Sequence, residues 1–170
     1  MIIKLNMKKI KALRCKLLVF LTHNLALPAL KKLRKAKPFP YTMKQLQQLP
    51  QGSLGNDLYE FINTKNLQLL THYARHDLKH IVLNFDTTEE GELCLQSFML
   101  GNGRISFPVL ATVGFGLLTA PEYWRKMYNS FIKGRRSNNI HNWQWFNLLG
   151  LQTAYLRNQI NHTYATTNNG

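Results

Sequence analysis

The sequence predicts an all-α protein, built as a single compact multi-helix domain with a basic amphipathic N-terminal arm. Apolar residues recur at helical spacing along most of the chain, whereas the alternating pattern typical of strands is scarce and no internal repeat is visible. A length of 170 residues with 45% hydrophobic residues suffices for one ordinary core and argues against a second domain. The two cysteines, Cys15 and Cys94, are too few for a disulfide framework, and we expect both to be reduced packing residues.

Positive charge is concentrated in the first third of the chain. Twelve of the 22 lysines and arginines precede the first acidic residue, Asp57, and the net charge of the chain is +14. This asymmetry predicts contact with a polyanion. No RNP-like motif, zinc-finger spacing or helix-turn-helix pattern supports nucleic acid as that partner.

Residues 1–36 form the predicted basic arm. Apolar side chains from Ile10 to Leu21 recur at helical spacing among its cations, which is typical of an amphipathic helix on an anionic membrane surface. A core face with a solvated basic back is the open alternative. The pattern does not fit a secretory signal, and a mitochondrial presequence ranks second because the arm is rich in lysine instead of arginine and serine.

The helical domain is expected over residues 37–162, followed by a frayed tail at 163–170. Pro28 is expected to begin the first short helix and Thr42 to cap the second, which ends near Pro50. In chain order, the expected helices span about 28–37, 42–50, 54–62, 67–83, 87–100, 108–118, 121–133 and 142–161.

Local signals fix several of these boundaries. Asn84 can adopt the left-handed conformation that ends the helix over 67–83. Thr87 followed by Glu90 predicts a capping box at the next helix start. The stretch 105–121 is uncharged but contains polar and helix-weakening residues, and it only reaches the lower limit of about 17 residues for a membrane span. We expect a buried or interfacial helix there.

Two histidines and nearby carboxylates predict a metal site. His76 and His80 are four residues apart, so their rings project from one helix face, one turn apart, and Asp77 shares the same arc. The short connection after Asn84 lets the next helix fold back, so that the carboxylate of Glu92 can meet the histidines. The sequence therefore predicts a divalent metal held by His76, Asp77, His80 and Glu92.

Two imidazoles with one or two carboxylates suit zinc (Zn2+), while Mg2+, Mn2+, Fe2+ and Co2+ remain open. Asp77 is either a direct ligand or the acceptor that orients an imidazole. The alternative to a metal site is a chance pair of histidines on a solvated helix face. We expect Glu89 and Glu90 to serve the helix cap and macrodipole, and His72 to lie at the edge of the core.

The spacing His-Asp-x-x-His, followed by Glu after eleven further residues, resembles the metal motif of the coenzyme Q (ubiquinone) biosynthesis protein four family. Two positions depart from the family pattern: Asn84 replaces a common Gly, and Thr88 replaces a common Asp. Further matching features are Gly52-Ser53-Leu54-Gly55 with Tyr59 and Phe61, then Arg75, Gly91, Gln96 with Phe98, and Trp145 with Leu156-Arg157.

The resemblance covers roughly residues 40–160. It implies an all-helical, membrane-peripheral protein of ubiquinone biosynthesis that holds a polyprenylated quinone precursor beside a divalent metal. The implied activity is oxidative decarboxylation at ring C1 of a polyprenyl 4-hydroxybenzoate-type substrate, organisation of the other ubiquinone-biosynthesis proteins, or both. The implied location is the cytoplasmic face of a bacterial membrane, or the matrix side of the mitochondrial inner membrane in a eukaryote.

Two features of the sequence are consistent with a membrane-peripheral protein that binds a prenylated lipid. The uncharged stretch 105–119 can line an apolar channel for a polyprenyl tail, and the basic arm can dock on anionic lipid. The main alternative is a non-catalytic prenyl-lipid-binding scaffold with a structural metal. A metallohydrolase ranks lower because Asp77 stands where such enzymes have Glu. The sequence assigns no catalytic or lipid-binding residue and leaves a homo-oligomer open.

Overall fold

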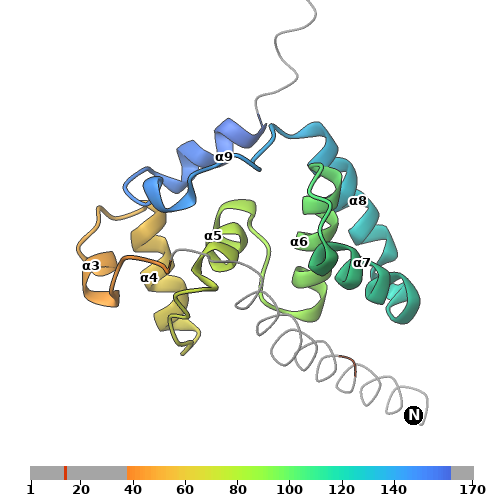
Figure 1. Cartoon of the computed structure of the whole chain (residues 1–170), viewed down its shortest axis with the longest axis horizontal. Coiled ribbons are helices and arrows are strands. Elements are labelled where there is room, and N and C mark those ends of the chain that lie inside the picture. The colour runs from red at the N-terminus through yellow and green to blue at the C-terminus, as the bar shows by residue number, and fades with distance from the viewer. Residues whose placement is uncertain (1–13, 15–37, 162–170) are drawn as a thin grey trace, which may run out of the picture.

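The computed structural model describes Arg14 and residues 38–161 of the chain (Figure 1). Except for Arg14, the predicted arm lies outside the described residues, as do the helix predicted over 28–37 and the predicted tail. The described part is built from α-helices and short 3-10 helices and contains no strand, which confirms the all-α prediction. The elements are α3 (Met43–Gln47), α4 (Leu54–Thr64), α5 (Ala74–Leu83), α6 (Glu89–Gly101), α7 (Phe107–Thr119), η2 (Pro121–Tyr123), α8 (Trp124–Arg136), η3 (Trp145–Asn147) and α9 (Thr153–Asn161).

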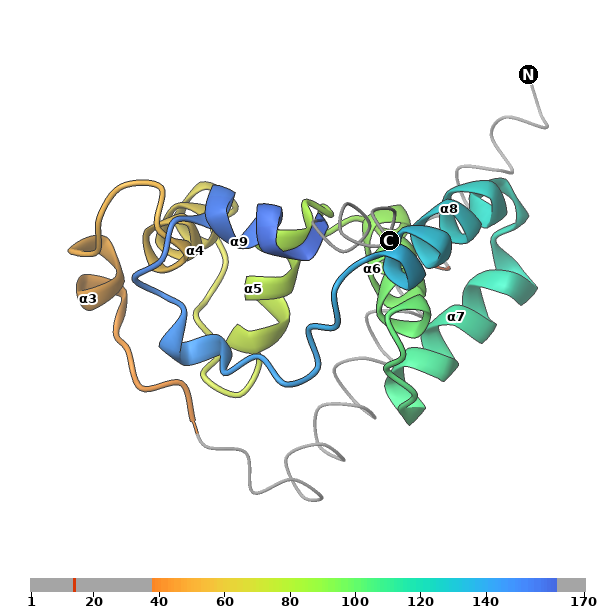
Figure 2. The same ribbon diagram turned by 90° about the horizontal axis from the view of Figure 1, so that it is seen from above.

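The helices form two groups that meet between α5 and α6 (Figures 1 and 2). One group contains α3, α4, α5 and α9, whereas in the other α6 packs along α8 and α7 lies against α6. One large apolar core draws side chains from both groups, and a smaller cluster lies between α6, α7 and α8. None of the described helices is both long enough and apolar enough to cross a membrane.

Two glycines allow α6 and α8 to cross with their backbones in close contact. A Cβ atom on Gly101 would lie 2.0 Å from the carbonyl oxygen of Phe131, and one on Gly134 would lie 2.1 Å from that of Phe98. Any larger residue at these two positions would push the helices apart. The crossing fixes α6, the helix that carries Glu92.

Residues 52–55 link the start of α4 to the chain before α9. The N–H of Leu54 donates to the carbonyl of Leu151, and the N–H of Gly55 donates to that of Leu149, both at 2.9 Å. These backbone hydrogen bonds therefore join two segments that lie about 95 residues apart in the sequence.

Two predicted helix ends are confirmed. The Thr42 hydroxyl accepts the N–H of Gln45, and the Gln45 side chain accepts the N–H of Thr42, which together form a capping box at α3. Asn84 ends α5 in the left-handed conformation, with φ 58° and ψ 46°.

The predicted start of the helix over 67–83 is wrong, because α5 begins only at Ala74. Asn66 is left-handed, with φ 50°, and residues after it turn before the helix forms. Leu67 and Leu70 remain exposed, and Leu69 packs against the core from a stretch that is not helical.

The predicted capping box at Thr87 and Glu90 is also wrong. Thr88 is the N-cap of α6, and its hydroxyl accepts the N–H of Gly91 at 3.2 Å. Because the third helical residue is then Gly91, no side chain can return the second hydrogen bond of a capping box.

The last predicted helix, over 142–161, is shorter than expected. The structure has α9 only from Thr153, and residues 142–152 form turns around the short η3. Trp145 in η3 is buried in the core and its ring lies 5.3 Å from that of Trp143, so aromatic packing replaces helical continuation.

The uncharged helix α7 buries little of its surface. Val109 and Gly116 are its buried residues, and Gly116 packs against Leu93 and Met127. Phe107 and Leu118 are 81% and 87% exposed. Of the two alternatives for this stretch, the buried helix is therefore wrong.

Cys94, on α6, is buried and free, as predicted.

Arg14 lies between the first turn of α6 and η2. Its guanidinium forms ion pairs with Glu89, Nε to Oε1 at 3.2 Å, and with Glu122, and it also donates to the carbonyl of Thr119. Hydrogen bonding to Glu122 raises the pKa of Arg14, although burial opposes this shift. Glu89 therefore lies in the first turn of the helix, as predicted, and also pairs with Arg14. Glu90 pairs with Lys126.

Candidate metal centre

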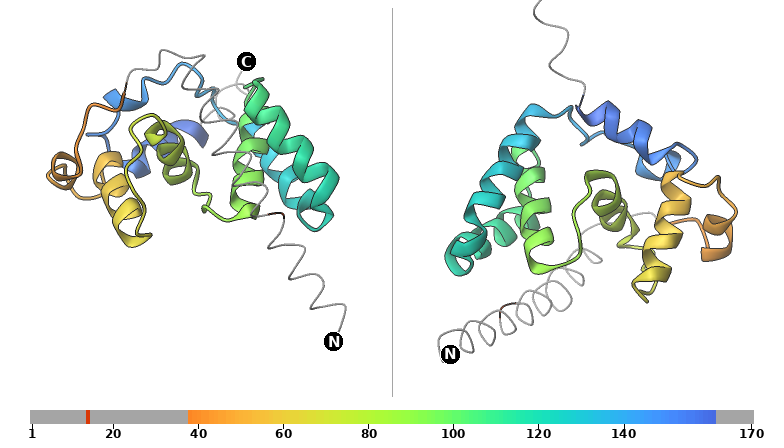
Figure 3. Two further views of the ribbon diagram at one scale, coloured as in Figure 1. Left: turned by 60° about the horizontal axis from the view of Figure 1, so that its bottom comes forward. Right: turned by 180° about the vertical axis from the view of Figure 1, so that it is seen from behind.

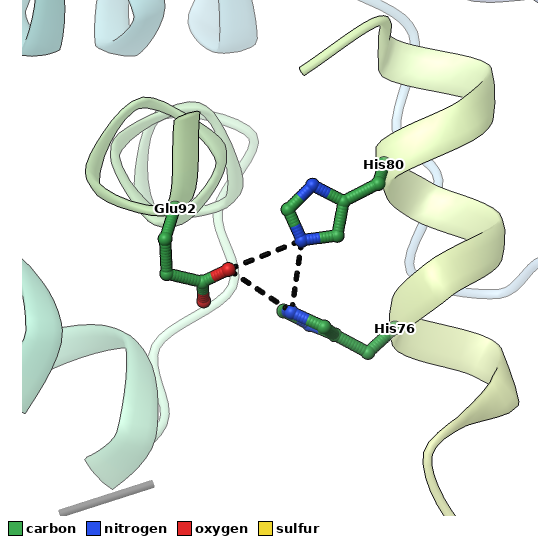
Figure 4. A group of neighbouring side chains, drawn as sticks. All are labelled: His76, His80 and Glu92. Atoms are coloured by element: carbon green, nitrogen blue, oxygen red, sulfur yellow. Dashed lines mark hydrogen bonds and ion pairs between the residues drawn. The ribbon is translucent and has the colours of Figure 1, made fainter. Parts of the chain in front are cut away.

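Three side chains from two helices converge on one point (Figure 4). His76 and His80 project from α5, and Glu92 faces them from α6. The Nε2 atoms of the two histidines are 3.0 Å apart, and each lies 3.1 Å from Oε2 of Glu92. The structure thus brings together three of the four residues that the sequence nominates as ligands.

The backbone at the end of α5 orients His80. After the left-handed Asn84 the chain turns back, and the Phe85 carbonyl oxygen lies 3.1 Å from Nδ1 of His80. A carbonyl can only accept a hydrogen bond, so Nδ1 carries the hydrogen. The lone pair of a neutral His80 is therefore on Nε2, the atom that faces His76 and Glu92.

Both ends of α5 are held by arginines. At its C-terminal end, Arg157 of α9 donates to the carbonyls of Ile81 at 2.8 Å and Val82 at 3.3 Å. Such carbonyls lack partners within the helix, and a cation there also complements the helix dipole. At the other end, the Arg75 guanidinium lies 5.5 Å from the ring centre of Phe146.

Glu92 is held by its own helix. The side chain of Gln96, one turn later, donates to Oε1 at 2.8 Å, and Oε2 is left to face the histidines. At the start of α6, a Cβ on Gly91 would lie 2.2 Å from the carbonyl oxygen of Asp86, so only glycine allows the loop to approach this closely. The spacing of Glu92 and Gln96 on one helix face is the sequence signal for this support.

The site is strongly polarised. Burial disfavours the ionised form of Glu92, but the charges and hydrogen bonds of His76 and His80 outweigh it and hold the pKa of Glu92 well below its usual range. Burial raises the pKa of Asp77 to about 6, with the histidines opposing this shift and Glu92 adding to it. The ring of Tyr73 lies 4.6 Å from that of His76, and burial raises the pKa of its hydroxyl, helped by Glu92 and Asp77.

Asp77 is not among the three donors that meet. It lies on α5 beside them, close enough for their charges to shift its pKa, and thereby adds negative charge to the surroundings of the site. His72 is exposed and is not part of the group. Sequence reasoning did not single out Phe85 or Tyr73, because a backbone carbonyl and an aromatic ring carry no ligand signature.

The three donors fit a divalent metal. Two imidazole nitrogens and one carboxylate oxygen are the ligand types of Zn2+, Mn2+, Fe2+ and Co2+ sites. With Nδ1 of His80 protonated, the Nε2 of a neutral His76 carries at most one hydrogen, which cannot serve all three short contacts. A cation at the centre would serve all three.

Comparison with known proteins supports the fold. No family model matches the chain, and no curated protein is similar to it in sequence. Among solved structures, the crystal structure of a protein from Nostoc punctiforme PCC 73102, provisionally assigned to ubiquinone biosynthesis, is similar with a TM-score of 0.61. The match covers 89% of this chain and 81% of that chain at 21% identity. At this identity the likeness shows a shared fold.

Proposed function

We propose that this chain is a metal-dependent, membrane-peripheral protein of ubiquinone biosynthesis that binds a polyprenylated quinone precursor. The observation that carries the proposal is the triangle of donor atoms from His76, His80 and Glu92. The spacing of these residues resembles the family motif, and the fold is similar to that of a protein provisionally assigned to the same pathway.

The chemistry that we propose is oxidative decarboxylation at ring C1. The ring carboxylate leaves as carbon dioxide, a hydroxyl derived from water takes its place, and two electrons pass to an oxidant of the dioxygen class. A bound divalent metal would supply Lewis acidity towards the ring carboxylate. Among the three donors only Glu92 is anionic, so a bound divalent ion would keep a net positive charge towards an anionic ring, and the nearby Asp77 would reduce that attraction.

The alternative is a prenyl-lipid-binding scaffold with a structural metal. Structural zinc sites are closed by four protein ligands, whereas catalytic sites keep a position open. Here three donors meet and Asp77 stays outside their group. The side chains of His76 and Glu92 remain 18% and 21% exposed, while His80 is 2% exposed, so the group lies at the edge of the described structure and is not fully enclosed. These observations favour a reactive site over a scaffold.

The surface near α7 supports attachment to an anionic membrane. The exposed side chains of α7 are apolar, and Trp124 and Tyr128 extend this surface onto α8, which lies beside α7 (Figure 3). Apolar and aromatic side chains enter the lipid interface, and each cation near an anionic surface contributes about 1 kcal/mol. Helix α8 has no acidic residue, and its cations Arg125, Arg135 and Arg136 can contribute to such contact, whereas Lys126 pairs with Glu90 and Lys133 lies over the Phe85 ring.

Elemental analysis of the purified protein, with mass spectrometry of co-purifying lipid, tests the proposal. We expect about one equivalent of divalent metal and a polyprenylated aromatic ring with its carboxyl group still attached. Failure to bind Zn2+, Mn2+, Fe2+, Co2+ or Mg2+ after chelation and reloading would contradict the metal-dependent function. Bound lipid without turnover in the presence of dioxygen would favour the scaffold.

A further inference from the structure

We infer that the three donor atoms form one triangular face of an octahedron, so that the metal they hold is six-coordinate with three adjacent positions open to exogenous ligands. The inference rests on the proposed function only in that the site binds a divalent metal. It concerns the arrangement around the ion, which the ligand types alone leave undecided.

The edges of the triangle distinguish the two common geometries. With metal–ligand bonds of about 2.1 Å, neighbouring ligands are about 3.0 Å apart in an octahedron and about 3.4 Å apart in a tetrahedron. The observed separations are 3.0 Å between the Nε2 atoms and 3.1 Å from each to Oε2 of Glu92. A tetrahedral ion on this triangle would need bonds of about 1.9 Å, shorter than zinc makes to nitrogen or oxygen.

The protein contributes one donor atom from each residue. The second carboxylate oxygen of Glu92 accepts the hydrogen bond from Gln96, so Glu92 acts through Oε2 alone. Nδ1 of His80 donates a hydrogen bond to the Phe85 carbonyl, which leaves only Nε2 of that ring to bind a metal. Three protein ligands on one face of an octahedron leave the three positions of the opposite face.

This arrangement favours redox-active, six-coordinate ions over four-coordinate zinc. Two histidines and one carboxylate on a single face, with open positions opposite, are the ligand set of non-haem Fe2+ oxygenases. Three adjacent positions can accept a chelating oxygen ligand, such as an aromatic carboxylate, together with dioxygen or water. His76 and Glu92 are partly exposed and His80 is buried, so exogenous ligands would have to approach on the side of His76 and Glu92.

Cobalt substitution tests the geometry without any measurement of activity. The full chain, freed of metal and loaded with Co2+, should show the weak visible absorption of six-coordinate cobalt, and X-ray absorption should give about six nitrogen or oxygen ligands near 2.1 Å. Fe2+-loaded protein should bind nitric oxide with the spin signal of a non-haem iron nitrosyl. Glu90→Gln, on the same helix but outside the triangle, should leave both spectra unchanged.

Each contrary result has a separate meaning. Intense cobalt absorption with four ligands near 2.0 Å would overturn the octahedral face but leave metal binding intact. An unchanged spectrum in His80→Ala would show that cobalt binds elsewhere and would also overturn the inference. Absence of uptake of any divalent ion would overturn the metal site itself, and with it the proposed function.

Discussion

His80 donates its Nδ1 hydrogen to the Phe85 carbonyl oxygen, 3.1 Å away, so a backbone group at the end of α5 decides which imidazole nitrogen faces the metal centre. The carbonyl reaches the ring because Asn84 adopts the left-handed conformation. The end of the helix and the tautomer of its histidine are therefore set by the same turn.

His80→Ala should lower metal affinity at least about 100-fold, because one of three donor atoms is lost. Isothermal titration with Mn2+ and Zn2+ measures the loss, and rescue of quinone synthesis in a strain that lacks the corresponding gene tests its functional effect. His72→Ala is the matched control, because His72 is exposed and outside the donor group. Full rescue by His80→Ala would remove the metal from the mechanism.

Gln96→Leu should weaken metal binding about 10- to 100-fold, because Glu92 loses the hydrogen bond that fixes its Oε1. The fold should persist, since leucine has a similar volume and high helix propensity. Metal titration and circular dichroism measure the two effects, with the exposed Gln159 replaced by leucine as the control. Unchanged affinity in Gln96→Leu would show that this hydrogen bond does not orient the ligand.

Asp77→Asn should stabilise the metal-free protein above pH 6. Burial raises the folded-state pKa of Asp77 to about 6 from its ordinary value of 3.8, so the folded state binds the proton more tightly than the unfolded state does. Stability from this group is present below pH 4 and declines as the pH rises to 6. The gain on substitution should not exceed about 2–3 kcal/mol. Urea denaturation at pH 4 and pH 7 measures it, and equal effects at both would contradict the assignment.

Arg14→Ala should reduce the free energy of unfolding by about 1–3 kcal/mol, because Glu89 and Glu122 lose their shared cation. Adding Glu122→Gln should restore part of the loss, since it removes one of the two negative charges that Arg14 no longer balances. Denaturant titration provides the measurement, and Arg125→Ala, on the exposed surface of α8, is the control. Equal stability of wild type and Arg14→Ala would show that the ion pairs contribute nothing.

Replacing both Phe107 and Leu118 with serine should weaken binding to anionic vesicles about tenfold or more, because an apolar side chain contributes about 1.5–3 kcal/mol when it leaves water. Their high exposure predicts little effect on folding. Co-sedimentation with phosphatidylglycerol vesicles measures binding. Leu67→Ser, an exposed apolar residue in the other helical group, is the control. Undiminished binding by the double variant would assign vesicle contact to another surface.

Local sequence signals predict much of the fold and the centre of the site. Thr42 and Asn84 act within a few residues of themselves, and His76 and His80 share a face by helical periodicity alone. The choice between Thr87 and Thr88 was beyond such rules, because both are good caps and the close approach of Gly91 to Asp86 decides between them.

Contacts between distant segments could not be predicted in the same way. Arg157 reaches the carbonyls at the end of α5 across 76 residues, and nothing in the local sequence names that partner. The start of α5 is a second example: the sequence does not reveal that Leu69 packs against the core from a non-helical stretch while Leu67 and Leu70 stay exposed. Periodicity reveals an amphipathic face but does not say what it meets.

Glu89 and Glu92 stand three residues apart in the first turns of α6, one paired with Arg14 and the other facing the two imidazoles. A helix transmits displacement along its length because its turns are bonded to one another. A displacement of Arg14 that moves Glu89 should therefore also rotate or shift Glu92 at the donor triangle. A cation at the donor triangle and the ion pair between Arg14 and Glu89 should therefore each affect the other.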